Sequence, residues 1–159
     1  MNMKVKIRRG FFETNSSSSH NVCIALTQDL RVPPTVYFCF NSFDYMFGPY
    51  NDMMMKASYL YTGLYFYNYK LFFKKIIPML EKNNIRVLYE KEEDISFDLY
   101  YSACWFDDFF NIISEKELLL KHFLFSPRSF ITGGWHNSDS KYYKNLDYEH
   151  YEFSPAGVG

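Results

Sequence analysis

The chain has 159 residues, of which 48% are hydrophobic and 22% are charged, and its formal net charge at pH 7 is -1. This length is typical of one domain, and the composition is that of a folded protein rather than a disordered one. The sequence pI of about 6.4 lacks the basic signature of nucleic-acid-binding proteins, which disfavours nucleic acid as a partner.

The N-terminal part of the chain predicts a β-hairpin with an unusual loop. Residues 4–9 and 21–26 are apolar or β-branched runs that favour short strands, paired antiparallel. The connection at residues 14–20 holds a threonine, an asparagine, four serines and a histidine. A chain reversal needs only a two-residue loop of the Asn-Gly or Asp-Gly type. The Ser-rich run therefore indicates a ligand or a reaction rather than a turn alone.

Three interpretations of this Ser-rich run are open. In an extended conformation Ser16, Ser18 and His20 share one face, which would bring a hydroxyl nucleophile near an imidazole base. In a curled conformation backbone N–H groups and hydroxyls form a concave anion site, and Arg8 and Arg9 would complement it for phosphate. Alternatively, the polar side chains satisfy only their own backbone. The catalytic candidates are His20, Ser18 and Ser16. The predicted ligand-binding residues here are Arg8, Arg9, Glu13, Thr14, Asn15, Ser16, Ser17, Ser18, Ser19 and His20.

The middle of the chain predicts a helical region between two strands. Residues 35–40 are β-branched and aromatic and residues 85–89 are apolar, as is typical of strands. The Gly-Pro pair at 48–49 predicts a turn, and apolar side chains between 53 and 80 recur at spacings of three and four, the period of a helix. Pro78 should kink or restart that helix. The unit resembles a βαβ or α+β crossover.

The C-terminal half predicts further helix and a short strand. The acidic run at 90–94 is expected to be a solvated loop or a first helical turn. Residues 105–113 favour a helix, and Ser114 with Glu117 has the spacing of a capping box, so a helix should begin afresh at Ser114. Residues 129–132 predict a strand.

A second candidate site follows that strand. Gly133 and Gly134 lead into a polar loop that carries His136 and Asp139, and loops on a rigid scaffold often carry function. These two residues join the predicted ligand-binding set. No HExxH motif or close Cys/His pairing accompanies them, so the sequence predicts neither a metal site nor a cofactor.

Cysteine usage and hydropathy predict a cytoplasmic protein. Cys23, Cys39 and Cys104 show no CxxC spacing and are expected to be buried thiols. No apolar signal segment follows the first residues, and lysines interrupt the most apolar window, 57–80, so no membrane association is predicted. Aromatic residues make up 21% of the chain, which fits either a binding interface or the codon usage of an AT-rich genome.

Residues 9–20 read R-G-F-F-E-T-N-S-S-S-S-H. This string resembles the N-terminus of a set of uncharacterised bacteriophage and Firmicute proteins that begin with a basic strand followed by F-E-T-N-S-S-S-S-H-S. Residues 124–134 resemble a later segment of the same proteins, and this chain has Asn21 where their pattern usually shows serine. The resemblance implies a phage or mobile-element origin and a functional N-terminal loop. It implies no activity, cofactor or catalytic residue.

Together these patterns predict an α+β or α/β fold. We expect one compact domain over residues 1–153 with a flexible tail at 154–159, and a mainly antiparallel sheet that includes the N-terminal hairpin and is packed by two or three helices.

The predicted function is binding. The chain would be a small cytoplasmic phage or mobile-element accessory protein that engages a host protein or a nucleotide-like ligand. Inhibition of a host defence system, of the anti-CRISPR type, is the most concrete form of this hypothesis. The alternatives are an enzyme acting on a phosphate-bearing or nucleotide substrate through the Ser-rich loop and His20, and a structural virion protein. The sequence shows no acid positioned to orient His20, which argues against the enzyme.

Overall fold

The structure, a computed structural model, describes residues 20–44, 47–99, 107–133 and 149–153. Along the chain its elements are β1 (His20–Ala25), β2 (Thr35–Phe38), β3 (Phe47–Tyr50), α1 (Met53–Asn68), the π-helical segment η1 (Phe72–Ile76), α2 (Ile77–Glu81), β4 (Arg86–Tyr89), the 3₁₀ turn η2 (Glu92–Asp94), α3 (Asp107–Glu115), α4 (Glu117–Phe125), β5 (Phe130–Gly133) and β6 (His150–Phe153). The fold is α+β.

The larger sheet has the strand order β3-β5-β1-β6, with all neighbours antiparallel. β1 is central, because β5 pairs with one of its edges and β6 with the other. Its side chains alternate between a helix-facing side, with Val22 and Ile24 in the core, and an opposite side with Cys23. Both neighbours of β1 thus come from the C-terminal half of the chain. The expected first arm of the hairpin, residues 4–9, lies outside the described residues.

The predicted crossover is present. β2 and β4 pair in parallel as a separate two-stranded sheet, and α1, η1 and α2 lie between them in the chain. α1 begins at Met53 because Asp52 caps it, its carboxylate accepting the Met55 N–H at 3.0 Å. Pro78 cannot donate a backbone hydrogen bond, and it stands in the first turn of α2, which follows η1 directly.

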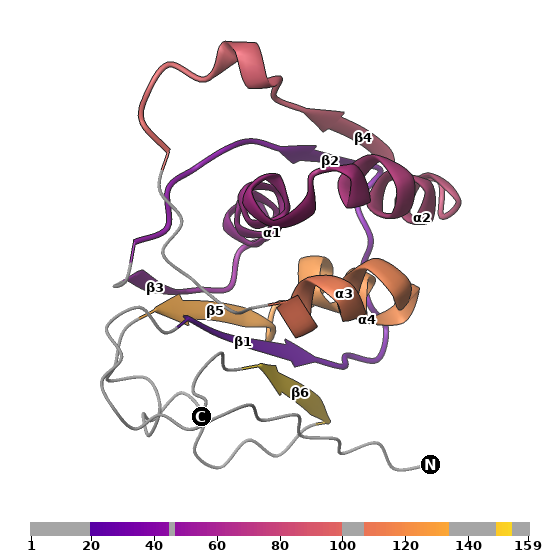
Figure 1. Ribbon diagram of the computed structural model, residues 1–159. Coiled ribbons are helices and arrows are strands. Elements are labelled where there is room, and N and C mark those ends of the chain that lie inside the picture. The colour runs from indigo at the N-terminus through magenta and orange to yellow at the C-terminus, as the bar shows by residue number, and fades with distance from the viewer. Residues whose placement is uncertain (1–19, 45–46, 100–106, 134–148, 154–159) are drawn as a thin grey trace.

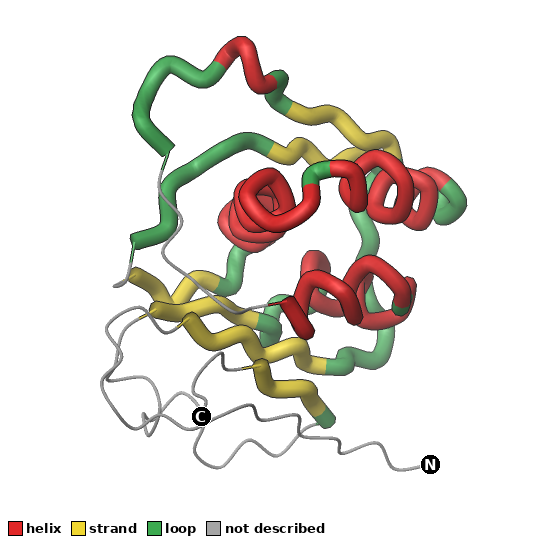
Figure 2. The backbone as a smooth tube through the Cα atoms, viewed as in Figure 1, coloured by secondary structure: helices red, strands yellow, loops and turns green. Residues whose placement is uncertain are grey.

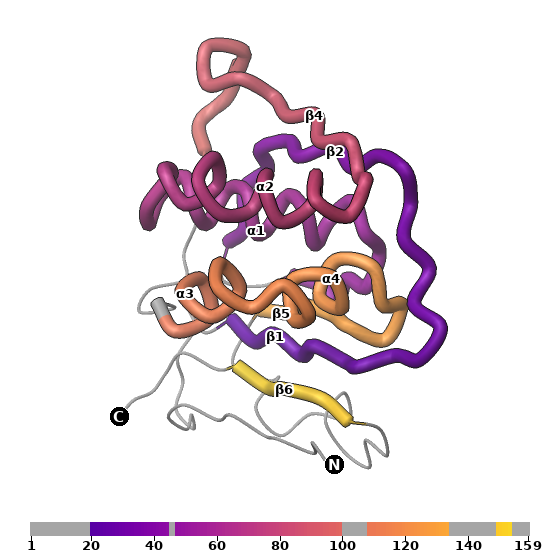
Figure 3. Tube along the Cα trace, turned by 90° about the vertical axis from the view of Figure 1, so that its right-hand side faces the viewer, coloured from indigo at the N-terminus to yellow at the C-terminus, as the bar shows by residue number. Residues whose placement is uncertain are grey.

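The helices lie between the two sheets (Figure 1). α1, α3 and α4 cover one face of the larger sheet, and the β2–β4 pair lies on the far side of the helices, as the backbone tube coloured by element also shows (Figure 2). The view turned by 90° shows the same layers (Figure 3). The core fills the helical layer with side chains from every layer, among them Val22, Leu60, Phe123 and Phe38. β4 lies above β2 in Figures 1 and 3, and the loop that carries η2 lies above β4.

The predicted turn at 48–49 is wrong, because Gly48 and Pro49 lie inside β3. This strand pairs with β5 and carries an irregularity in register between Phe47 and Tyr50. A side chain at Gly48 would place its Cβ 2.8 Å from the Ile131 carbonyl oxygen, and the residue adopts a φ of +79°. Glycine is required here because the strand must approach its neighbour closely in a conformation that other residues avoid.

One expectation fails in the C-terminal half, and one strand there was not predicted. Ser114 is buried inside α3 rather than starting a helix, and α4 begins at Glu117 after Lys116, which makes no side-chain capping bond. β6 is a strand that the alternation of residues did not reveal, because His150 and Glu152, two side chains usually found on the surface, point to its buried outer face.

Candidate functional site

His20 belongs to the predicted Ser-rich site and is fully buried between the larger sheet and α1. Its Nε2 lies 2.9 Å from the Asp44 carbonyl oxygen and its Nδ1 lies 2.9 Å from the Tyr59 hydroxyl. A carbonyl can only accept, so Nε2 carries the proton and Nδ1 accepts from Tyr59. Burial lowers the pKa of His20 to about 4, with the Asp44 carbonyl bond acting in the opposite direction. The imidazole is therefore neutral near pH 7.

This geometry gives His20 a structural role in joining β1, α1 and the segment before β3. Both ring nitrogens are engaged, and Phe47 packs edge-on against the ring at 4.9 Å. A general base needs a nitrogen within reach of substrate, and this ring offers none to solvent. The remaining predicted site residues lie outside the described residues: Arg8, Arg9, Glu13, Thr14, Asn15, Ser16, Ser17, Ser18, Ser19, His136 and Asp139.

Lys56 is a second buried titratable group, with only 1% of its surface exposed. Its Nζ donates to the carbonyl oxygens of Ser126 at 2.7 Å and Ser129 at 3.0 Å, just after α4. Burial lowers the pKa of Lys56 to about 7, with Asp52 acting in the opposite direction. A cation at the carbonyl end of a helix is favourable, so Lys56 anchors α1 to this turn. The sequence signal for the burial of Lys56 is its position among apolar residues that recur at helical spacing.

A hydrogen-bond network extends from that turn to the end of β1. The Ala25 N–H donates to the Ser129 hydroxyl at 2.8 Å, which in turn donates to the His122 carbonyl at 2.8 Å. The Thr27 N–H donates to His122 Nδ1 at 3.0 Å, so Nδ1 is an acceptor. Burial lowers the pKa of His122, which keeps this acceptor available. The Ser129 hydroxyl thus serves as the acceptor for the Ala25 N–H at this corner.

The outer face of the larger sheet carries a histidine, a glutamate and a cysteine: His150, Glu152 and Cys23. His150 Nε2 lies 2.8 Å from Glu152 Oε2, and Glu152 stands directly opposite Cys23 in the β1–β6 register. All three side chains are buried. Cys39 is only half-buried, in contrast to the prediction, and Cys104 lies outside the described residues. Within the described ranges no three His, Cys, Asp or Glu side chains are placed to hold a metal ion.

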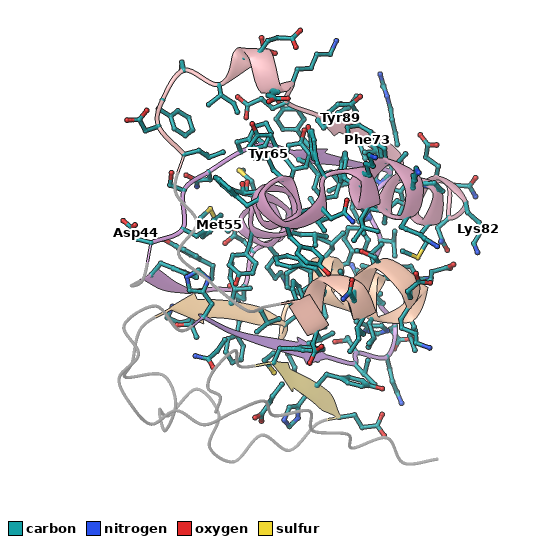
Figure 4. The ribbon with its side chains drawn as sticks, viewed as in Figure 1. Asp44, Met55, Tyr65, Phe73, Lys82 and Tyr89 are labelled. Atoms are coloured by element: carbon teal, nitrogen blue, oxygen red, sulfur yellow. The ribbon has the colours of Figure 1, made fainter. Side chains whose placement is uncertain are left out.

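A partly exposed chain of ring contacts, which we call the aromatic row, runs through Phe66, Tyr65, Tyr69, Phe73 and Tyr89. Successive ring centroids lie 5.4, 5.1, 5.0 and 5.4 Å apart, and each pair is close to perpendicular. Phe66 is 51% exposed and Phe73 39% exposed, and the three tyrosines are half-buried. Figure 4 shows Tyr65, Phe73 and Tyr89 in the upper part of the molecule, where the helices meet the smaller sheet.

Helical geometry builds the row. Tyr65, Tyr69 and Phe73 follow one another at intervals of four residues, from the last turns of α1 into η1, so they stack along one side of the continuous helical segment. Tyr89 extends the row onto β4. The row also packs against the core, since the ring centroids of the buried Phe40 and of Tyr65 lie 5.0 Å apart.

Hydroxyl bonds fix the tyrosine rings. Tyr61 donates to the Glu90 carbonyl at 2.6 Å, so the Tyr69 hydroxyl, 2.7 Å away, donates to Tyr61. The Tyr65 hydroxyl donates to Glu92 Oε2 at 2.8 Å, and this bond raises the pKa of Tyr65. These bonds hold the Tyr65 and Tyr69 rings of the row in one arrangement.

The spacing of the aromatic row can be read from the sequence, but the solvent exposure of its rings cannot. The four-residue recurrence of Tyr65, Tyr69 and Phe73 predicts a helix equally well whether the rings face the core or the solvent. The neighbouring Phe72 and Ile76 do face the core. Only the packing of β4 beside η1 decides which rings of this helix stay accessible.

Comparison of the chain with protein-family models, with curated proteins and with solved structures found no match. In the part of the chain that the structure describes, every helix is too short or too polar to cross a membrane.

Proposed function

We propose that the protein is a binding protein that engages another protein through the aromatic row. The observation that carries this proposal is the contiguity and exposure of the row on an ordered helix. Aromatic side chains are enriched in the energetically important centres of protein interfaces. Large contiguous exposed apolar patches are uncommon on monomeric proteins and mark interaction sites.

A protein partner fits the row better than a nucleotide-like ligand does. Nucleobases stack on flat, open ring faces, whereas here the rings pack edge-to-face and form an uneven surface. The charged side chains near the row have both signs, with Lys70 and Lys74 on the helical segment and Glu92 in η2, all exposed. Such a mixed rim suits a protein surface rather than a polyanion.

The resemblance of residues 9–20 to phage and Firmicute proteins supports a host protein as the partner. Inhibition of a host defence system is the form of this function that we propose. The buried, doubly hydrogen-bonded His20 does not support the competing enzyme, because that mechanism required this imidazole as its acid or base.

The experiment is a quantitative affinity capture from a Firmicute lysate. The wild-type protein is compared with the double variant Phe66→Lys/Phe73→Lys, which changes the two most exposed rings of the row. The control is Leu118→Lys, because Leu118 is a 58% exposed apolar residue on α4. Circular dichroism and thermal unfolding establish that all three proteins are folded.

We expect one or more host proteins to be enriched by the wild type and by Leu118→Lys, and to be reduced at least about tenfold by the double variant, as for an interface hot spot. Equal enrichment by the double variant and the wild type would contradict the proposal. So would the assembly of the wild type into large homogeneous particles, which is the behaviour of a virion component.

A further inference from the structure

Within the described ranges, one edge of β4 is unpaired. The Arg86 N–H donates to the Pro34 carbonyl and the Glu90 N–H donates to the Phe38 carbonyl, each at 2.8 Å. In a parallel ladder, alternate residues point toward the same neighbour. Arg86 and Leu88 therefore direct their backbone groups to β2, as Glu90 does its N–H, while the backbone groups of Val87 and Tyr89 point away from it. No residue in the described part of the chain pairs with that side of β4.

An unpaired edge on a parallel strand is unusual in a folded protein. Parallel strands are normally buried within larger sheets, and exposed edges invite pairing with another strand. Among the described residues the smaller sheet has two strands, and Figures 1 and 3 show β4 above β2. The outward face of β4 also carries Leu88, which is 38% exposed beside the exposed Tyr37 of β2.

The outer face of β4 is complementary to itself. It presents the exposed Arg86 and Leu88, and the half-buried Glu90 follows one step beyond the strand, so that a cation and an anion flank an apolar centre. If a second strand β4 runs antiparallel with Leu88 opposite Leu88, then Arg86 of each copy stands opposite Glu90 of the other. In the same register Val87 and Tyr89 form hydrogen-bonded pairs across the two strands, because their backbone groups are the ones that point outward.

The hydrogen-bond pattern selects this register over its neighbours. Only Val87 and Tyr89 can exchange backbone bonds, so the strand can otherwise shift only by pairing Val87 with Val87 or Tyr89 with Tyr89. The first shift places Leu88 opposite Arg86, and the second places it opposite Glu90. Both bury a charged side chain against an apolar one, which is unfavourable.

The charges are available for pairing between copies. The structure shows no ion pair or side-chain bond of Arg86 with a described residue. Glu90 uses Oε1 to accept the Phe40 N–H at 2.8 Å. Its second carboxylate oxygen remains able to accept from a guanidinium.

We propose that two copies of the chain associate through their β4 edges about a two-fold axis at Leu88, which joins the two small sheets into one four-stranded sheet of order β2-β4-β4-β2. The occupant of the edge is a second copy because the strand complements its own reverse in charge, in apolar contact and in backbone pairing. A pairing of single short strands buries less surface than permanent dimers do, so the dimer dissociates on dilution.

The test is sedimentation equilibrium of the full chain from about 1 µM to 1 mM, the range of weak associations. Arg86→Glu and Glu90→Lys each create two like-charge contacts across the axis and should be monomeric. An equimolar mixture of the two variants restores opposite charges at both contacts and should dimerise. Val87→Pro removes an outward N–H without touching the β2 ladder and should also be monomeric. Arg31→Glu is the control, because it makes the same charge change at an exposed site outside β4, and it should dimerise like the wild type.

A wild-type chain that stays monomeric at the highest concentration would overturn the proposal. An Arg86→Glu variant that dimerises like the wild type would overturn it as well. Failure of the mixture to dimerise while each variant is folded by circular dichroism would show that the charges do not meet across the axis.

Discussion

Acid should destabilise the fold through His20, and the magnitude follows from its burial. The pKa of His20 is about 4 in the folded chain against 6.5 for the ordinary group. The unfolded chain therefore binds a proton first as the pH falls, so the free energy of unfolding decreases. The stabilising contribution is fully present above pH 6.5 and is lost between pH 6.5 and pH 4. At about 1.4 kcal/mol per pH unit, the loss reaches roughly 3 kcal/mol.

Urea denaturation of the wild type and of His20→Gln at several pH values between 7 and 4.5 measures this effect. Glutamine does not titrate, but its amide offers a donor for the Asp44 carbonyl and an acceptor for the Tyr59 hydroxyl. At pH 7 we expect the variant to be less stable by about 1–2 kcal/mol, because the bonds fit less well. The difference should shrink as the pH falls and change sign before pH 4.5, because by then the wild type has lost about 2.5 kcal/mol through His20. Carboxyl groups titrate alike in both proteins, so their contributions cancel in the difference between the two free energies of unfolding.

A stability difference that stays constant across this pH range would refute the reasoning. It would mean that His20 accepts a proton equally well in the folded and unfolded chains, and hence that the ring is not held neutral by burial. The imidazole would then be available for acid-base chemistry, and the enzyme hypothesis would regain its central residue.

Three further changes probe the structure. Gly133→Ala should cost about 1–3 kcal/mol in urea denaturation, because its Cβ would lie 2.5 Å from the Phe47 ring, which His20 and Tyr50 hold in place. Tyr61→Phe should cost about 1–2 kcal/mol by the same assay, since it removes the hydroxyl that joins Tyr69 to the Glu90 carbonyl; an unchanged stability would contradict that role. For Lys56, with a pKa of about 7 against 10.5 when unfolded, the unfolded chain keeps its proton longer, so stability should rise from pH 7 to pH 9.5 in the wild type relative to Lys56→Met. Parallel pH profiles of these two proteins would argue against a lowered pKa of Lys56 in the folded chain.

The sequence predicted the elements whose residue pattern has a single physical explanation. The strands around Val22 and Val36 are β-branched runs, and the parallel pairing of β2 with β4 follows from a helical region between two strands. Local patterns failed where tertiary contacts outweigh local preference. Gly48 looks like a turn residue, but it lies in β3 because only a residue without a side chain fits against the Ile131 carbonyl.

Candidate sites were harder to predict than the elements. A histidine after four serines suggests chemistry, yet His20 is buried because Tyr59 and Asp44, far along the chain, satisfy both ring nitrogens. In β6, the side chains of His150 and Glu152 lie on the same face of the strand and hydrogen-bond to each other. Two polar residues therefore occupy the positions where an apolar alternation would be expected. The aromatic row depends on which side of one helix remains uncovered, and only the assembled layers determine that.

The most direct test of the binding function is the affinity of a captured host protein, measured by titration calorimetry against three forms of the chain. The account predicts that the wild type and Leu118→Lys bind with the same dissociation constant and that Phe66→Lys/Phe73→Lys binds at least about tenfold more weakly. Equal affinity of all three proteins would contradict the claim that the aromatic row is the binding surface.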